Sequence, residues 1–305
     1  IALRGGAAAR PNNTRKMSPR LAFQQLTQPF TAAQLIALSV GFFALLNPLG
    51  GALSSACFPF YRQMSRKDRA GWATRVPAFV HAVGMAYLSY AAFFEERLWT
   101  NPWHGSCESM KSTILVSLGY MLYDTLNEVR CVLTCPKYKA TADMMTHHVV
   151  TAVCMLAYLN QVNTRGWEWS FSSLTSLMLG TEITTPLLNL LWMLRKAGLG
   201  EHWSAKATGL AIMVGFVIFR VGVQAWQSYT VLLQPDAPVR ALWDDAYQKQ
   251  HGIPRDTLQA AIAISTILLV LNSYWLTLMV RKALDLFGFT KGVSANSKSL
   301  KDHDY

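Results

Sequence analysis

Two adjacent histidines interrupt an otherwise apolar run of the chain, Asp143-Met-Met-Thr-His147-His148-Val-Val-Thr-Ala-Val-Cys-Met-Leu-Ala-Tyr158. The interior of a lipid bilayer disfavours ionisable side chains, which are rare there and normally face other protein groups. We therefore interpret this stretch as a membrane-spanning helix inside a bundle. The other apolar helices of the chain are expected to pack around it and around a few more polar positions at similar depth.

The composition supports a membrane protein. Of the 305 residues, 51% are hydrophobic and only 15% are charged, whereas charged residues make up about 25% of a soluble domain. The 10 Trp, 11 Tyr and 14 Phe residues provide the aromatic content common at membrane interfaces. The apolar blocks have about 20 residues each, enough to cross roughly 30 Å of hydrocarbon. The sequence predicts an all-α fold, a polytopic transmembrane helical bundle of about seven spans.

The predicted spans divide the chain into four parts. These are a basic N-terminal extension (1–30), a first membrane segment with a basic loop (31–69), the main transmembrane domain (70–285) and a polar C-terminal tail (286–305). The seven spans are expected at 31–60, 76–94, 113–133, 140–159, 171–194, 205–233 and 260–280. A kink or a broken helix is expected at Asn47-Pro48, because proline lacks a backbone donor.

The charges in the loops predict an orientation. Lys and Arg gather at 61–75, 134–139, 195–206 and beyond 281, while Asp and Glu lie at 95–111 and 234–258. This alternation places the C-terminus on the basic side and the N-terminus opposite. The first 67 residues contradict that rule, since they hold six Arg and two Lys and no acidic residue. Either a partner holds the basic tail there, or the first block is a re-entrant hairpin around Pro48.

The acid-free N-terminal region also bears on localisation. Its Arg-, Ala- and Ser-bearing composition, with Ile rather than Met at position 1, predicts a mature terminus left by removal of a mitochondrial presequence. The alternative is an ordinary basic tail. We favour the mitochondrial inner membrane over the endoplasmic reticulum, and we expect other membrane-protein subunits to contact the extension. A nucleic-acid partner is not expected, because no aromatic platform or known fold accompanies the basic residues.

Motifs of several soluble enzyme classes are missing from the sequence. It contains no Gly-rich phosphate loop and no Gly-x-Ser-x-Gly elbow. Cys131 and Cys135 lie one helical turn apart, a spacing that suits neither a zinc knuckle nor a redox motif. The five cysteines are an odd number and do not indicate a disulfide framework. We expect no metal and no cofactor.

Five ionisable residues lie in the inner part of predicted spans: Asp124, His147, His148, Glu182 and Arg220. Each is costly if it faces lipid, so we expect them to face the bundle interior and to pair with one another. Arg220 could pair with Glu182 or with Asp124. The pairs could serve only helix packing and register, or they could do chemistry.

The histidines admit a chemical interpretation as well as a packing one. Asp143 precedes His147 by four residues, on the same helix face, and could orient its ring. A neutral histidine beside a carboxylate can act as a general base or as an acyl acceptor. Such a pair can also simply satisfy its own hydrogen bonds.

The order and spacing of several motifs resemble those of the TLC-domain (TRAM/LAG/CLN homology) superfamily across 70–285. The motifs are Gly119-Tyr-Met-Leu-Tyr-Asp124, His147-His148-Val-Val-Thr, Glu182-Ile-Thr-Thr-Pro-Leu-Leu-Asn189, Phe219-Arg220 and Leu271-Asn272-Ser-Tyr-Trp275. That superfamily includes the ceramide synthases and a non-synthase branch linked to membrane-lipid composition. The single carboxylate in the Glu182 motif resembles the non-synthase branch.

This resemblance implies a non-catalytic integral membrane protein that binds or organises membrane lipids. Together with the acid-free N-terminal region, it leads us to expect an accessory subunit of a larger mitochondrial membrane complex. The residues implied for lipid binding, or for a buried polar cluster, are Asp124, His147, His148, Glu182, Asn189 and Arg220. The alternative is a ceramide-synthase-like acyltransferase. It would use His147 and His148, oriented by Asp124 or Asp143, to transfer an acyl group from acyl-CoA to a sphingoid amine. A transporter or lipid scramblase is a third possibility, disfavoured because the chain shows no internal repeat.

Overall fold

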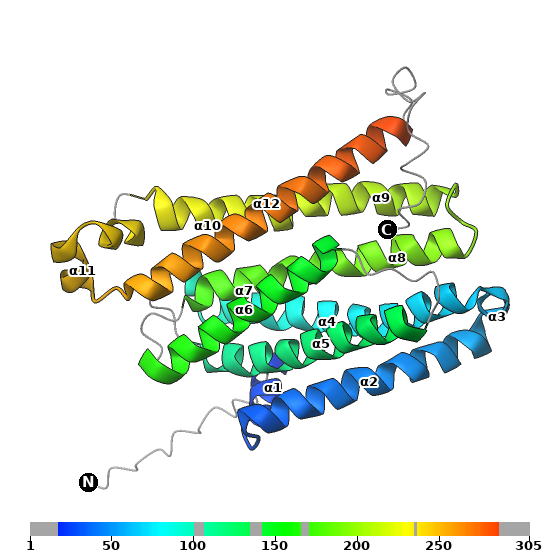
Figure 1. The fold of residues 1–305 in the computed structure, drawn as a ribbon, viewed down its shortest axis with the longest axis horizontal. Coiled ribbons are helices and arrows are strands. Elements are labelled where there is room, and N and C mark those ends of the chain that lie inside the picture. The colour runs from blue at the N-terminus through cyan, green and yellow to red at the C-terminus, as the bar shows by residue number, and fades with distance from the viewer. Residues whose placement is uncertain (1–17, 101–106, 135–141, 166–170, 235–236, 287–305) are drawn as a thin grey trace, which may run out of the picture.

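The computed structural model describes residues 18–100, 107–134, 142–165, 171–234 and 237–286. This part of the chain is helical and contains no strand, which confirms the all-α prediction. Figure 1 shows the long helices lying side by side as one elongated bundle.

The long elements follow one another along the chain, and two of them change helix type midway. They are α2 (Ala32–Cys57), α4 (Arg66–Glu95), α5 (Glu108–Thr134), α6 (Ala142–Arg165), α7 (Ser172–Gly180) with η2 (Thr181–Thr184) and α8 (Thr185–Lys196), α9 (Trp203–Gly215) with η3 (Phe216–Gly222) and α10 (Val223–Leu232), and α12 (Arg255–Leu286). The short elements are α1 (Pro19–Thr27), α3 (Pro59–Gln63), η1 (Leu98–Thr100), η4 (Pro238–Leu242) and α11 (Asp245–His251).

Among the described residues, 5 helical segments are long and apolar enough to cross a membrane: Ala32–Cys57, Arg66–Glu95, Ser172–Lys196, Trp203–Leu232 and Arg255–Leu284. The α5 and α6 helices are 27 and 24 residues long, and they carry Asp124, His147 and His148 of the predicted site. They are long enough to span but are not among these 5, so the number of seven spans stays a prediction.

The α2 helix runs without interruption through Pro48, so the expected broken helix and the re-entrant hairpin are both wrong. One face of α2 packs against α4 and α5. The fit to α4 is close: a Cβ added at Gly50 would meet Val76 at 2.7 Å. Toward α5, the Asn47 amide donates to the Tyr123 hydroxyl at 2.8 Å.

The prediction of a basic loop at 61–75 is wrong as well, because α4 already begins at Arg66. Ser65 caps this helix, its hydroxyl accepting a hydrogen bond from the Asp68 backbone N–H at 3.1 Å. Serine is among the preferred residues at this position. The second predicted span therefore starts ten residues too late, and Arg75 belongs to the bundle.

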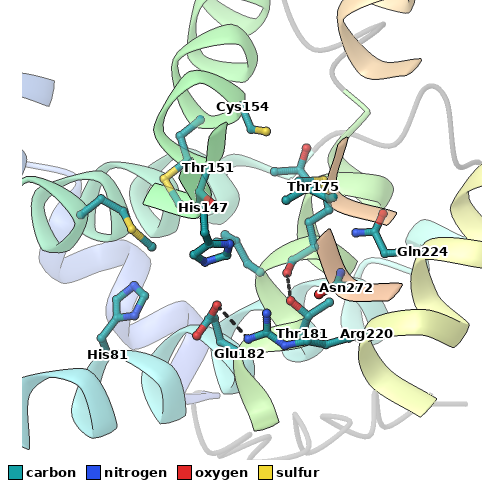
Figure 2. Close-up of a pocket in the computed structure, with 15 residues that line it drawn as sticks. His81, His147, Thr151, Cys154, Thr175, Thr181, Glu182, Arg220, Gln224 and Asn272 are labelled. Carbon is teal, nitrogen blue, oxygen red and sulfur yellow. Dashed lines mark hydrogen bonds and ion pairs between the residues drawn. The ribbon is translucent and has the colours of Figure 1, made fainter. Parts of the chain in front are cut away.

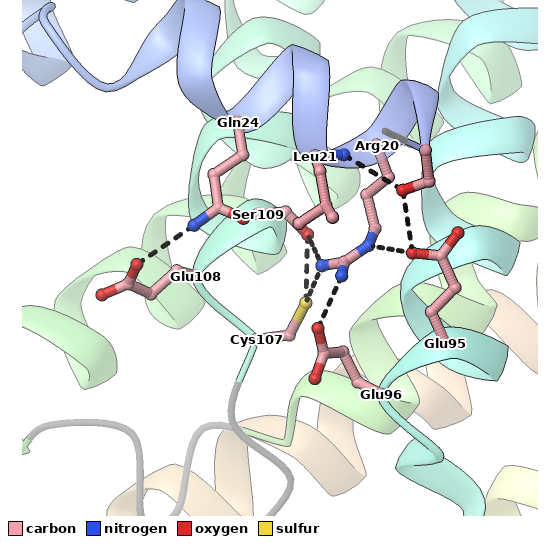
Figure 3. Close-up of polar contacts among 9 residues, drawn as sticks. Arg20, Leu21, Gln24, Glu95, Glu96, Cys107, Glu108 and Ser109 are labelled. Carbon is pink, nitrogen blue, oxygen red and sulfur yellow. Dashed lines mark hydrogen bonds and ion pairs between the residues drawn. The ribbon is translucent and has the colours of Figure 1, made fainter. Parts of the chain in front are cut away.

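The basic N-terminal region is held by the chain's own carboxylates where the structure describes it (Figure 3). Arg20 in α1 is 5% exposed, and its guanidinium lies 2.7 Å from Glu95 and 2.7 Å from Glu96, measured nitrogen to oxygen. A third nitrogen donates to the Ser109 hydroxyl at 3.1 Å. Burial by itself lowers the pKa of Arg20, but the hydrogen bond to Glu95 and the adjacent charges raise it above its ordinary value.

These contacts fix one end of the bundle, which we call the acidic end: the end where α4 finishes and α5 begins. Figure 1 shows α1 and α11 at this end and α3 at the other. Because α2 starts at the acidic end, the described N-terminal part lies opposite the basic loops. The predicted contact with other subunits concerns residues 1–17 as well, and these lie outside the described residues.

Candidate functional site

Two irregular helical turns face each other halfway along the bundle. The 3₁₀ turn η2 ends where α8 begins with Pro186 in its first turn, because proline has no backbone N–H to continue the preceding helix. Opposite it, α9 passes into the π-helical turn η3, a feature that is frequent at functional sites. The two turns are in contact. They bring Glu182 and Arg220 together.

Arg220 and Glu182 form a buried network with two threonine hydroxyls. The Nη2 atom of Arg220 lies 3.5 Å from Oε1 of Glu182. Its Nε donates to the Thr184 hydroxyl at 3.0 Å, and the Thr185 hydroxyl donates to Glu182 at 2.7 Å. A buried ion pair repays its desolvation only when further hydrogen bonds satisfy it. Of the two partners predicted for Arg220, the structure therefore pairs it with Glu182 and not with Asp124.

A cavity of about 60 Å³ opens beside this ion pair. Figure 2 shows the His147 imidazole, the Glu182 carboxylate and the Arg220 guanidinium facing the same space, with His81 nearby. The lining residues come from several helices and are His81, Met121, His147, Thr151, Cys154, Met155, Thr175, Met178, Leu179, Thr181, Glu182, Arg220, Gln224, Leu268 and Asn272. The wall is therefore polar on one part and apolar on the rest. A volume of this size holds about four waters or one small polar group.

One polar atom in the wall lacks a partner. Gln224 is 2% exposed, and its Oε1 atom has no hydrogen bond among the described residues. A buried acceptor left without a donor costs roughly 1–3 kcal/mol. The cavity therefore presents an acceptor that a bound donor, from a ligand or from water, would satisfy.

The two histidines point in different directions. His147 lines the cavity and stands edge-on to Trp275, with ring centroids 5.6 Å apart. His148 does not line it; its Nε2 lies 3.3 Å from Oδ2 of Asp124. Neighbours on a helix diverge by about 100°, which accounts for the split. His147 can touch a bound molecule, whereas His148 with Asp124 joins α6 to α5.

Asn189 belongs to a third polar group. Its Oδ1 accepts a hydrogen bond from the Arg75 guanidinium at 3.0 Å, and Arg75 lies 4.7 Å from the centre of the Trp192 ring. Neither Asn189 nor Arg75 lines the cavity. The six residues predicted as one cluster thus separate into three neighbouring groups, of which only the Arg220 group and His147 surround the cavity.

The sequence analysis missed His81, Arg75 and Gln224 as members of this region. His81 is 2% exposed; it lies 2.9 Å from the Ser117 hydroxyl and stacks on Tyr120 at 3.8 Å between ring centres. In the predicted span 76–94 it would lie near one end, because that span begins ten residues after the true start of α4. The capping serine before Arg66 was the available signal for an earlier start.

The remaining expectations concern Asp143 and metals. The side chain of Asp143 lies outside the described residues, so its suggested role beside His147 stays a prediction. Within the ranges that the structure describes, no group of three or more His, Cys, Asp or Glu side chains is arranged to hold a metal ion.

Comparison with known proteins identifies the family. The TLC domain family matches residues 71–281. A zebrafish (Danio rerio) TLC domain-containing protein 4-B is 25% identical over 269 residues, which cover 85% of this chain and 91% of that protein. A Dictyostelium discoideum TLC domain-containing protein 4 A is 22% identical over 234 residues, covering 75% and 81%. No solved structure matches. This chain, with its membrane-length helices, is an integral membrane protein that belongs to the TLC domain family.

Proposed function

We propose that this protein binds a membrane lipid inside its helical bundle, without covalent chemistry, by taking a polar group of the lipid into the cavity beside Arg220 and Glu182. The observation that supports the proposal most is the composition of the cavity wall. Arg220, Glu182, His147 and Gln224 contribute polar atoms, and three methionines and two leucines make up the apolar part of the wall. Sites for small amphiphilic molecules combine an apolar lining with a few placed polar groups in this way.

The charges of the site favour an uncharged polar group. The positive charge of Arg220 is offset by Glu182 at 3.5 Å, so the cavity offers no net charge to attract a free anion. The side-chain oxygen of Gln224 receives no hydrogen bond from the described residues. A hydroxyl or an amide N–H of a lipid supplies such a donor, which makes these groups the preferred occupants over a phosphate.

The apolar part of the wall suits the adjoining methylene groups. Four of its side chains are Met121, Met155, Leu179 and Leu268. Methionine is unbranched and adapts its shape to what it contacts. Since the cavity measures about 60 Å³, it accommodates the polar group and a few carbons rather than an entire lipid.

The test is the lipid that co-purifies with the protein. We expect Gln224→Leu to lower bound lipid at least fivefold, as measured by native mass spectrometry of the detergent-solubilised chain. Gln227→Leu is the matched control: Gln227 lies one turn away, is equally buried, and donates to the Leu174 carbonyl instead of lining the cavity. Equal lipid content in both folded variants would contradict the proposal.

An acyltransferase of the ceramide-synthase type is the second candidate. It is favoured by His147 lying in the cavity wall, with the Asp124–His148 pair alongside it. Purified protein would be incubated with acyl-CoA and a sphingoid base. Turnover that disappears in His147→Ala would support this candidate, and no turnover above a blank would end it.

We further propose that the protein is an accessory subunit in the mitochondrial inner membrane. The support is the sequence of residues 1–67, which holds eight basic and no acidic residues. Mass spectrometry of the proteins that co-purify from mitochondria would identify the complex. Recovery as a stable monomer from the endoplasmic reticulum would contradict both the location and the subunit role.

A further inference from the structure

A second, larger cavity of about 220 Å³ lies between α6, α7 and α12. It is near the acidic end of the bundle, where α6 finishes and α12 begins. It shares Cys154 and Met178 with the Arg220 cavity and is otherwise lined by different residues. The two spaces are therefore neighbours along α6, separated by a wall to which these two side chains contribute.

The outer part of this cavity carries a buried donor without an acceptor. Gln161 lines the cavity and is 4% exposed. Its Oε1 accepts a hydrogen bond from the Thr257 hydroxyl at 2.7 Å, which fixes the amide. Its Nε2 has no partner among the described residues. Asn160 and Thr164 lie beside it in the lining. The rim thus offers one oriented N–H to an acceptor on a bound molecule.

The charge of the rim restricts what that molecule can be. Asp256 lines the cavity and places a carboxylate at its rim. One oxygen of this carboxylate accepts a hydrogen bond from the Thr257 backbone N–H at 2.8 Å. A carboxylate at the rim repels an anionic head group. The acceptor for Gln161 is therefore the oxygen of an uncharged group, such as a hydroxyl.

The inner part of the cavity is apolar and runs along the helices. It is lined by Ala157, Leu174, Ala260, Ala261 and Ile264. The small alanines of α6 and α12 leave room between these helices. Gln161 and Cys154 are seven positions apart on α6, which corresponds to about 10 Å along the helix. This is a slot for a single hydrocarbon chain.

We propose that this cavity is a second lipid site, which binds the uncharged hydroxyl head of a single-chain lipid at Gln161 and lays its chain along α6 and α12 toward Cys154 and Met178. The site is separate from the Arg220 cavity and does not depend on the function proposed there. Its specificity comes from the Gln161 amide, whose N–H donates to a neutral oxygen, and from the Asp256 carboxylate, which disfavours an acid.

Photolabelling of the full chain in nanodiscs tests this site. The probes are hexadecanol and hexadecanoic acid that carry the same diazirine in the middle of the chain. We expect the alcohol to label the α6 and α12 residues of the cavity, mapped by peptide mass spectrometry, at least fivefold more than the acid. Equal labelling by the two probes, or labelling spread over lipid-facing helices, would overturn the proposal.

Three variants separate the site from general effects. Gln161→Leu is expected to lower labelling by the alcohol at least fivefold, and Ala261→Phe to abolish it by filling the slot. Gln259→Leu, an exposed glutamine on α12 that does not line the cavity, should leave it unchanged. Unaltered labelling in folded Gln161→Leu and Ala261→Phe protein would refute the site.

A charge variant keeps the test decisive if Gln161→Leu fails to fold. Asp256 is exposed, so Asp256→Asn should fold and should raise labelling by the acid at least threefold. No gain for the acid would refute the assigned role of Asp256. Unchanged lipid in Gln224→Leu together with the expected labelling here would count against the Arg220 cavity alone, and the reverse would count against this site alone.

Discussion

Two arginines in this protein pair with carboxylates in very different surroundings. Arg220 meets Glu182 halfway along the bundle, where the two side chains are 7% and 13% exposed. Arg20 meets Glu95 and Glu96 at the acidic end, where the arginine is equally buried but the carboxylates are 37% and 39% exposed. The arginines differ little in burial. The difference lies in whether water reaches the partner.

That difference predicts how each pair responds to loss of its arginine. A carboxylate that water can reach is re-solvated when its partner is removed, whereas one enclosed among helices is left as an uncompensated charge. The Arg20 pairs should therefore contribute modestly to stability and respond to salt. The Arg220 pair should be costly to break and insensitive to salt.

The largest effect is expected for Arg220→Met. This change leaves Glu182 buried without its cation, and we expect a loss of roughly 3–5 kcal/mol in the free energy of unfolding. Unfolding in mixed micelles, followed by tryptophan fluorescence, would measure it. The double variant Arg220→Met/Glu182→Leu should recover most of the loss. A double variant as unstable as the single one would show that the buried charge is not the cause.

A smaller effect is expected for Arg20→Met. Glu95 and Glu96 are re-solvated, but the buried hydrogen bonds of Arg20 disappear, so we expect a loss of about 1–2 kcal/mol. The same unfolding assay, repeated in 1 M salt, should show this difference shrink, because the screening length falls to roughly 3 Å. Salt should leave the Arg220→Met difference unchanged. Equal salt responses of the two variants would contradict the idea that access of water to the carboxylate sets the strength of each pair.

The smallest effect is expected for Arg240→Ala. Arg240 lies 3.6 Å from Asp244, four residues on, and both side chains are open to solvent at 45% and 36%. Exposed pairs at this spacing contribute about 0.3–0.5 kcal/mol. Arg240 also lies 4.6 Å from the centre of the Tyr247 ring, a contact that contributes from about 0.5 kcal/mol at an exposed site. We therefore expect a loss of about 1 kcal/mol or less in the unfolding assay. A loss as large as that of Arg20→Met would mean that exposure of the partner does not set the order.

Part of the site followed from the sequence. Asp124, His148, Glu182 and Arg220 were expected in the interior because ionisable groups are costly in lipid, and the structure places each of them there. For Arg220, however, the sequence left two possible partners, Glu182 and Asp124. Which groups meet depends on the rotation of each helix, and here also on the 3₁₀ and π turns, which hydrophobic periodicity does not reveal.

Other parts were missed because one helix boundary was wrong. Moving the start of α4 from residue 76 to Arg66 brings Arg75 into the bundle and moves His81 away from the end of the span. Both changes follow from a single capping serine in a segment rich in Lys and Arg. Charged residues suggested a loop, but tertiary contacts with Asn189 and Trp192 hold Arg75 inside.

The sequence by itself determined that this is a helical membrane protein, because apolar blocks of about 20 residues satisfy their backbone groups in a bilayer as helices. Its motifs resemble those of the TLC-domain superfamily. It also determined which ionisable residues must avoid lipid. Only the tertiary structure decided that α2 continues unbroken through Pro48, that Arg20 is held by Glu95 and Glu96, and that His147 rather than His148 lines the cavity. Those outcomes depend on contacts between helices far apart in the chain, which local patterns do not encode.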